Sequence, residues 1–121
     1  MPRDCLKFVK PLVQDWYKEH FFGIYLSTRN TVIKVELISI GTLNASLIHP
    51  RELFRPAIMK RANQIIILHN HPSGEADPSE DDIMTTERMK KAGGILGIEV
   101  LDHIIFTKKE LFYSFKEERG W

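Results

Sequence analysis

The stretch Gln64-Ile-Ile-Ile-Leu-His-Asn-His-Pro-Ser-Gly-Glu-Ala-Asp-Pro-Ser-Glu-Asp-Asp82 passes from an apolar run into a polar loop and then into an acidic turn. Its opening run, 64–68, is short and apolar, which is typical of a buried central strand. Residues 69–78 are rich in loop-forming residues. Ser79 and the acidic residues up to Asp82 indicate the N-cap and first turn of a helix. We therefore predict strand, loop and helix in succession, with histidines at the end of the strand.

The elements on the C-terminal side follow from residue spacing and from glycine. The helix that begins at Ser79 should run to about Ala92, where Gly93-Gly94 would stop it. Residues 98–106 predict another strand, and residues 111–115 predict a last, short strand.

On the N-terminal side, the pattern predicts a helix followed by a hairpin. Residues 4–17 carry apolar side chains at helical spacing, but Pro11 lies inside the pattern, so the helix should kink or begin late. Residues 21–26 and 31–40 predict two strands, and the turn-forming residues 27–30 would join them.

Between this hairpin and the central strand, we predict a third short strand at 45–48 and then a helix. Pro50 suits the first position of a helix, because its missing N–H is not needed there. The helix should run to about Ala62, although Pro56 must distort it. The order helix, strands, helix, strand, helix, strands favours an α/β sandwich around a mixed sheet.

The composition is that of an ordinary globular domain without a strong charge. The chain has 121 residues, of which 17 are basic and 16 acidic, for a formal net charge of +1. This balance weakens the case for a nucleic-acid-binding surface. The single cysteine, Cys5, excludes an intrachain disulfide, and no apolar run approaches the roughly 20 residues of a membrane span. Because no signal-peptide pattern begins the chain, we expect a cytoplasmic protein.

A metal site is one interpretation of the two histidines. Residues two apart on a strand project to the same face, so His69 and His71 could share a metal ion if the strand continues through Asn70. A catalytic zinc usually has three protein ligands. Asp82 is favoured as the third, because it lies three residues after Ser79 and its side chain can turn back toward the strand end. The remaining acidic candidates are Glu75, Asp77, Glu80 and Asp81. The other interpretation is that the histidines are polar residues entering a loop.

The spacing of these residues resembles a known motif. The string His69-x-His71-Pro72, six residues, Ser79, two residues and Asp82 is similar to the JAMM motif of JAB/MPN-type metalloproteases at every position. The fuller wording His69-Asn-His-Pro-Ser-Gly74 resembles the bacterial RadC branch of that superfamily. Further RadC-like segments follow the same order from about Glu19 to the C-terminus: Gly41-Thr42, His49-Pro-Arg-Glu52, Ala62, Asp102-His-Ile-Ile105 and Tyr113-Ser-Phe115. The resemblance implies a three-layer α/β/α sandwich around a mixed, largely antiparallel sheet, with layers like those of cytidine deaminases.

The resemblance also implies a role for each motif residue. His69, His71 and Asp82 would ligate one zinc ion per chain, with water in the fourth position. Ser79 would help to stabilise the tetrahedral intermediate, and Glu19, which matches the upstream glutamate of the family, would deprotonate the water. On the residues alone, Glu19 could instead be a solvent-exposed residue that closes a helix, and Ser79 could be only an N-cap.

Other polar residues have less specific patterns. Glu52 is a rival base, but its Pro-Arg-Glu context suits the start of a helix. We expect His20 and His49 to be structural. His103 follows Asp102, and this pair is either a support behind a metal ligand or a satisfied structural pair.

The resemblance implies an enzyme, a zinc-dependent metallopeptidase or isopeptidase that cleaves an amide bond in an unknown protein or peptide. The alternative is a DNA-repair-associated RadC protein that acts through nucleic acid or partner proteins without peptidase activity. A non-catalytic interaction domain is disfavoured, because every motif residue is present. An HNH nuclease needs a more extended motif, and a zinc deaminase needs a Pro-Cys-x-x-Cys pair that a single cysteine cannot form.

We expect a single domain over residues 1–121, with an N-terminal helical segment at 1–18 and a core at 19–121. Full-length members of the resembled family carry a helix-hairpin-helix segment before this domain, and we expect that segment to be absent here. The pattern leaves the oligomeric state and the identity of the substrate open.

Overall fold

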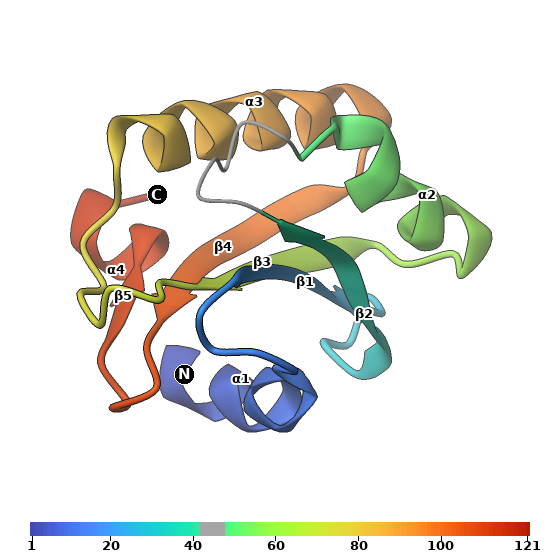
Figure 1. Cartoon of the computed structure of the whole chain (residues 1–121). Coiled ribbons are helices and arrows are strands. Elements are labelled where there is room, and N and C mark those ends of the chain that lie inside the picture. The colour runs from blue at the N-terminus through green and yellow to red at the C-terminus, as the bar shows by residue number, and fades with distance from the viewer. Residues whose placement is uncertain (42–47) are drawn as a thin grey trace.

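The computed structural model describes residues 1–41 and 48–121 and contains one five-stranded sheet (Figure 1). The order across the sheet is β2-β1-β3-β4-β5. The strands are β1 (Glu19–Leu26), β2 (Val32–Gly41), β3 (Gln64–Asn70), β4 (Glu99–Phe106) and β5 (Phe112–Ser114). Only β3 and β4 run parallel, and the other neighbours are antiparallel. The predicted mixed, largely antiparallel sheet is therefore confirmed.

Helices cover both faces of this sheet (Figure 1). One face is covered by α1 (Pro2–Val9), which continues into the short 3-10 helix η1 (Lys10–Leu12). The opposite face carries α2 (Pro50–Met59) and α3 (Glu80–Leu96). A last helix, α4 (Phe115–Arg119), follows β5 directly. Among the described residues, none of the helices has the length and apolar character needed to cross a membrane.

The alternation of side chains along β1 divides the core into two halves. Phe21 and Tyr25 pack toward α2 and α3, whereas Phe22, Ile24 and Leu26 pack toward α1. Every residue of β1 is buried, as expected for a strand near the middle of a sheet that is covered on both faces. The two clusters pack the sheet against the helices on both of its faces.

The register brings three chain segments to one end of the sheet. The antiparallel pairing of β1 with β3 places Phe21 opposite His69, so the first residues of β1 lie beside the last residues of β3. The parallel partner β4 ends at the same edge, with Asn70 opposite Phe106. The loop after β3 then leads to the N-terminus of α3. This end of the sheet is where the sequence places its histidines.

Two helices differ in length from the prediction. The first was predicted at 4–17, but α1 ends at Val9, and the chain passes through η1 and leaves helical geometry at Val13. Pro11 lacks the N–H that would continue the helical ladder. The helix α3 was predicted to stop at Gly93-Gly94, yet it runs on to Leu96. A Cβ at Gly93 would lie 2.4 Å from the carbonyl oxygen of Ile98, so this glycine serves close packing rather than helix termination.

The remaining differences are small. Helix α2 ends at Met59, short of the predicted Ala62, and it does contain Pro56. The strand predicted at 111–115 is shorter, because Ser114 ends β5 and caps α4, accepting the N–H of Glu117 at 3.1 Å. The strand predicted at 45–48 falls outside the described residues except for Ile48, which is not in a strand.

Candidate metal centre

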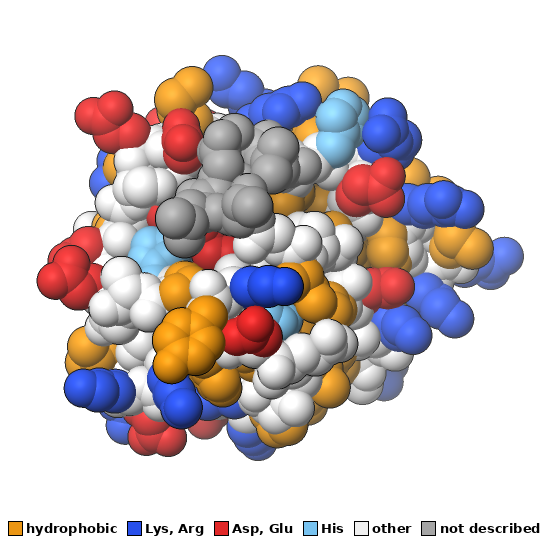
Figure 2. Space-filling model, in the orientation of Figure 1, with side chains coloured by type: hydrophobic (Ala, Val, Ile, Leu, Met, Phe, Trp, Pro, Cys, Tyr) orange, Lys and Arg blue, Asp and Glu red, His pale blue; other side chains and the backbone are white. Residues whose placement is uncertain are grey.

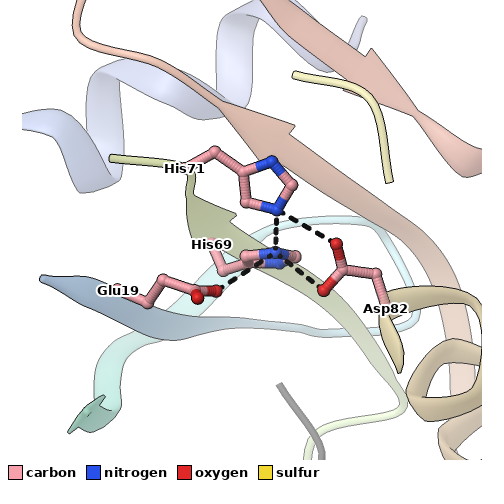
Figure 3. Close-up of side chains that lie close together, drawn as sticks. All are labelled: Glu19, His69, His71 and Asp82. Atoms are coloured by element: carbon pink, nitrogen blue, oxygen red, sulfur yellow. Dashed lines mark hydrogen bonds and ion pairs between the residues drawn. The ribbon is translucent and has the colours of Figure 1, made fainter. Parts of the chain in front are cut away.

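Four side chains from three elements and a loop converge at the end of the sheet (Figure 3). Glu19 comes from the start of β1, His69 from β3, His71 from the first position after β3, and Asp82 from the first turn of α3. One nitrogen or oxygen atom from each residue lies within 4.8 Å of the others. Within the described part of the chain, this is the group of histidine and carboxylate side chains that could hold a metal ion.

The distances within this group suit a small tetrahedral cation. The Nε2 atoms of His69 and His71 are 3.0 Å apart. The Nε2 of His69 lies 3.2 Å from Oδ1 of Asp82, and the Nε2 of His71 lies 3.0 Å from Oδ2 of Asp82. Ligand atoms at 2.0–2.1 Å from a tetrahedral zinc are separated by about 3.3–3.4 Å. A slight outward shift of the three side chains therefore makes room for the ion.

The strand geometry that aligns the two histidines continues beyond β3. The N–H of His71 donates to the carbonyl of Phe106 at 2.9 Å, which extends the ladder with β4 by one residue. His69 and His71 are therefore two residues apart on an extended chain, and both imidazoles point into the group. His69 is fully buried and His71 half-buried.

A capping box turns Asp82 toward the histidines. The hydroxyl of Ser79 accepts the N–H of Asp82 at 3.0 Å, and the N–H of Ser79 donates to Oδ2 of Asp82 at 2.9 Å. The second bond draws the carboxylate back over the N-terminus of α3, in reach of both imidazoles. Ser79 is exposed and its hydroxyl acts as the N-cap, while the catalytic role that the motif implies for it stays a prediction.

The hydrogen bond of His71 to the loop decides where its proton lies. Its Nδ1 is 2.9 Å from the carbonyl oxygen of Glu75, which can only accept, so Nδ1 carries hydrogen and donates. The lone pair on Nε2 then faces Oδ2 of Asp82 and Nε2 of His69. A carboxylate and lone pairs at about 3 Å repel each other unless a positive charge lies between them. That charge is either a second proton on His71 or a metal ion.

The pKa directions agree with this requirement. Burial alone would lower the pKa of His71, but its hydrogen bonds with Asp82 and with the Glu75 carbonyl outweigh burial and raise it. Burial would raise the pKa of Asp82, yet the neighbouring imidazoles of His69 and His71 hold that pKa far below its usual range. Asp82 is therefore ionised at neutral pH. A divalent cation would displace the proton of His71, as metal ions do at such sites.

Glu19 is buried at the start of β1, rather than exposed at the end of a helix. Its side chain is 7% exposed, and Oε1 lies 3.8 Å from Nε2 of His69. Among the described side chains, this oxygen is one of the few buried polar atoms without a hydrogen-bond partner. Burial raises the pKa of Glu19 to about 7, with the His71 charge opposing and the Asp82 charge adding to the shift. A carboxylate with this pKa can accept and release a proton near neutral pH.

The other acidic candidates lie outside the group. Glu52, the rival base, is exposed on α2, where its carboxylate pairs with Arg51 at 3.5 Å. The side chains of Glu75, Asp77, Glu80 and Asp81 are exposed. Of these residues, Glu75 still takes part through its main-chain carbonyl, which holds His71.

The remaining histidines lie outside the group. His20 and His49, which the sequence predicts to be structural, contact the backbone, and His103, for which the sequence left two roles open, contacts His69. His49 caps α2, with Nδ1 accepting the N–H of Arg51 at 3.0 Å. The Nε2 of His20 accepts the N–H of Gln14 at 3.2 Å. His103 lies behind the group, with its Nε2 2.7 Å from Nδ1 of His69.

Two polar residues near the site have no counterpart in the sequence predictions. Thr86 lies one turn after Asp82 on α3, and its hydroxyl contacts both His103 and the main chain of Asp82. Asn70 lies between the two histidines and contacts the backbone around Glu19. The spacing of Thr86 from Asp82 could have suggested its position, but its contact with His103 depends on packing between α3 and β4.

Comparison with known sequences assigns the chain to a family. Residues 1–121 match the RadC-like JAB domain family, and the chain belongs to that family. A UPF0758 protein of Chlorobium chlorochromatii (strain CaD3) is 50% identical over 114 residues, which cover 94% of this chain and 51% of the relative. A UPF0758 protein of Methanosarcina mazei is 44% identical over 117 residues, covering 97% of this chain and 51% of the relative. UPF0758 protein ABC2615 of Shouchella clausii is 48% identical over 120 residues, covering 99% and 51%. The chain thus spans about half the length of these relatives.

Proposed function

We propose that this domain is a zinc-dependent hydrolase of the JAMM type, a metallopeptidase or isopeptidase that cleaves an amide bond in a protein or peptide. The observation that carries the proposal is the convergence of His69, His71 and Asp82 at 3.0–3.2 Å beside the buried carboxylate of Glu19, whose Oε1 has no hydrogen-bond partner. Three of these residues would ligate the metal, and Glu19 would accept a proton. Membership of a JAB-domain family supports the same class.

The donor set favours zinc over other common cations. Two imidazole nitrogens and one carboxylate are the ligand types of catalytic zinc sites that leave a position open for water. Magnesium and calcium prefer sites made of oxygen ligands. The small size of the group, with one atom of each of the four residues within 4.8 Å of the others, also suits a four-coordinate ion.

Each residue would then have a separate task. When bound, zinc would supply a Lewis acid and lower the pKa of water at its open position. Glu19, with its pKa raised to about 7 by burial, would accept a proton at its carboxylate and release it to the leaving amine. Ser79, at the N-terminus of α3, would offer its hydroxyl to the carbonyl oxygen of the scissile bond. His69, His71 and Asp82 would hold the metal.

Elemental analysis is the first test. Protein purified without chelators or a polyhistidine tag should contain about one zinc per chain. The His71→Ala and Asp82→Ala variants should lose it, whereas Glu19→Gln should keep it. Folded wild-type protein that stays metal-free after zinc is added back would refute the proposal. If zinc is bound, a screen of peptide and isopeptide substrates follows, with Glu19→Gln as the inactive control.

The nucleic-acid alternative has less support. On the face that Figure 2 shows, acidic and basic side chains are interspersed, and Lys and Arg stand both on the α2 side and at the lower left. A nucleic-acid site usually needs a more continuous basic surface, and the formal net charge here is only +1. A gel shift that persists at physiological ionic strength would favour this alternative over the hydrolase.

A further inference from the structure

His69 is held from behind by a chain of hydrogen bonds that leads back to Asp82. Its Nδ1 lies 2.7 Å from Nε2 of His103. The Nδ1 of His103 lies 2.5 Å from the hydroxyl oxygen of Thr86, and this hydroxyl lies 2.7 Å from the main-chain carbonyl oxygen of Asp82. This series of hydrogen bonds therefore begins and ends at residues of the metal site, since the Asp82 side chain shares the site with His69.

The main-chain carbonyl of Asp82, at the end of this series of hydrogen bonds, fixes the direction of each bond in it. The carbonyl of Asp82 can only accept, so the single hydroxyl proton of Thr86 is donated to it. The Thr86 oxygen must then accept from Nδ1–H of His103, whose Nε2 is left with a lone pair. That lone pair accepts Nδ1–H of His69, and the Nε2 lone pair of His69 points into the metal site.

The partner of His69 is an unusual one for a metal ligand. A ligating histidine most often donates its second N–H to a carboxylate, a main-chain carbonyl or water. Carboxylates and carbonyls only accept, so they fix the tautomer of the ligand directly. An imidazole such as His103 can donate or accept, so it needs a further group to fix its own tautomer. Thr86 is that group.

Stacked rings keep the two imidazoles in these orientations. The ring of Phe21 stacks on His69, with centroids 4.4 Å apart and an interplanar angle of 18°. The ring of Phe115 stacks on His103 at 4.9 Å and 12°. Both histidines have no exposed surface. Because water does not reach either ring, the hydrogen bonds select the tautomer.

We propose that His103 and Thr86 are positioning residues that fix the tautomer of His69 and thereby raise the affinity of the site for zinc. The proposal deepens the proposed function and rests on its metal centre. Without the Thr86 hydroxyl, the hydrogen of His103 could lie on Nε2 instead of Nδ1. His69 would then present an N–H to the site, where the metal needs a lone pair.

The matched pair Thr86→Val and Thr86→Ser tests this directly. Valine has the shape of threonine without the hydroxyl, while serine keeps the hydroxyl and loses a methyl group. Zinc affinity is measured at pH 7 by competition with a chromophoric chelator, on variants shown to be folded by circular dichroism. We expect Thr86→Val to bind zinc about 10-fold to 100-fold more weakly, as is typical when a supporting partner of a ligand is lost. Thr86→Ser should stay close to wild type.

A spectroscopic measurement separates tautomer control from simple packing. Long-range proton–nitrogen NMR of the imidazoles in the zinc-free protein should place hydrogen on Nδ1 of both His69 and His103. Hydrogen on Nε2 of either ring would overturn the proposal, and so would wild-type zinc affinity in Thr86→Val. Wild-type protein that binds no zinc would instead refute the proposed function. Phe115→Leu removes the stack but keeps the hydrogen bonds, so it should retain the wild-type tautomers.

Discussion

The side-chain amide of Asn70 forms hydrogen bonds with the backbone of the residues on either side of Glu19. Its Oδ1 accepts the N–H of His20 at 2.6 Å, and its Nδ2 donates to the carbonyl of Lys18 at 3.0 Å. The backbone pairing of β1 with β3 ends at Phe21. The Asn70 side chain therefore holds the first residues of β1, which lie beyond this pairing. The residue between the two histidines therefore fixes the position of the carboxylate beside them.

Asn70→Ala should displace Glu19 without removing the metal ligands. The buried N–H of His20 would lose its partner, which costs about 1–3 kcal/mol. The carbonyl of Lys18 would keep the His20 imidazole, whose Nδ1 lies 2.9 Å away. We expect a lower free energy of unfolding in urea, a marked loss of hydrolytic activity and zinc content close to wild type. Loss of zinc in a folded Asn70→Ala protein would show that Asn70 supports the ligands rather than Glu19.

The buried carboxylate of Glu19 should make the zinc-free protein less stable at high pH. Because its pKa is raised from 4.5 to about 7, the folded state holds a proton that the unfolded state releases between these values. Stability is therefore lost as pH rises from 4.5 to 7. One pKa unit corresponds to about 1.4 kcal/mol, so the loss is at most about 3.5 kcal/mol.

Glu19→Gln removes this titration while keeping the shape of the side chain. Urea unfolding of zinc-free protein should show the variant to be more stable than wild type at pH 8, and the difference should vanish at pH 4.5. A constant difference at both pH values would mean that the carboxylate does not titrate in the folded protein as its burial implies.

Zinc binding should weaken as the pH falls, because the metal competes with the proton on His71. The pKa of His71 is raised by Asp82, so this imidazole is protonated in the zinc-free protein at mildly acidic pH. We expect the zinc dissociation constant to rise steadily from pH 8 to pH 5.5, measured by chelator competition. In Asp82→Asn the partner charge is gone, so the remaining weak affinity should depend less on pH over this interval.

The two adjacent glycines of α3 should respond to alanine in opposite ways. A Cβ at Gly93 would lie 2.4 Å from the Ile98 carbonyl oxygen, whereas a Cβ at Gly94 would have nothing within 4 Å. Gly93→Ala should lower the free energy of unfolding by about 1–3 kcal/mol through overpacking. Gly94→Ala should raise it by about 0.5–1 kcal/mol, because alanine is the better helix former. Equal effects in thermal unfolding would contradict the packing role of Gly93.

The sequence predicts the parts of this molecule that depend on neighbours along the chain. The alternation through His69 and His71 places both imidazoles on one side, and the Ser79 cap predicts the return of Asp82 toward them. Both features are set within one strand or one helical turn. The motif resemblance added Glu19, which is remote in the chain from the other three.

The parts that the sequence did not predict depend on packing between distant segments. His103 contacts His69 because β3 and β4 pair in parallel with a fixed register. The sequence of neither strand alone determines that register. Gly93 looked like a helix stop because glycine often ends helices, but the close approach of Ile98 decides its role. The shorter α1 has a local cause, in that Pro11 ends the pattern earlier than the apolar spacing indicates.

The positions of the site residues along the chain would give a bound metal ion a mechanical role as well. An ion held by His71 and Asp82 would close the segment 72–81 into a loop, and His69 would tie the same ion to β3. In a chain whose lone cysteine has no partner for an intrachain disulfide, the ion would serve as its cross-link. Removal of the ion would then free this loop first, and a protease added after chelation would cut between His71 and Asp82 before it reaches the sheet.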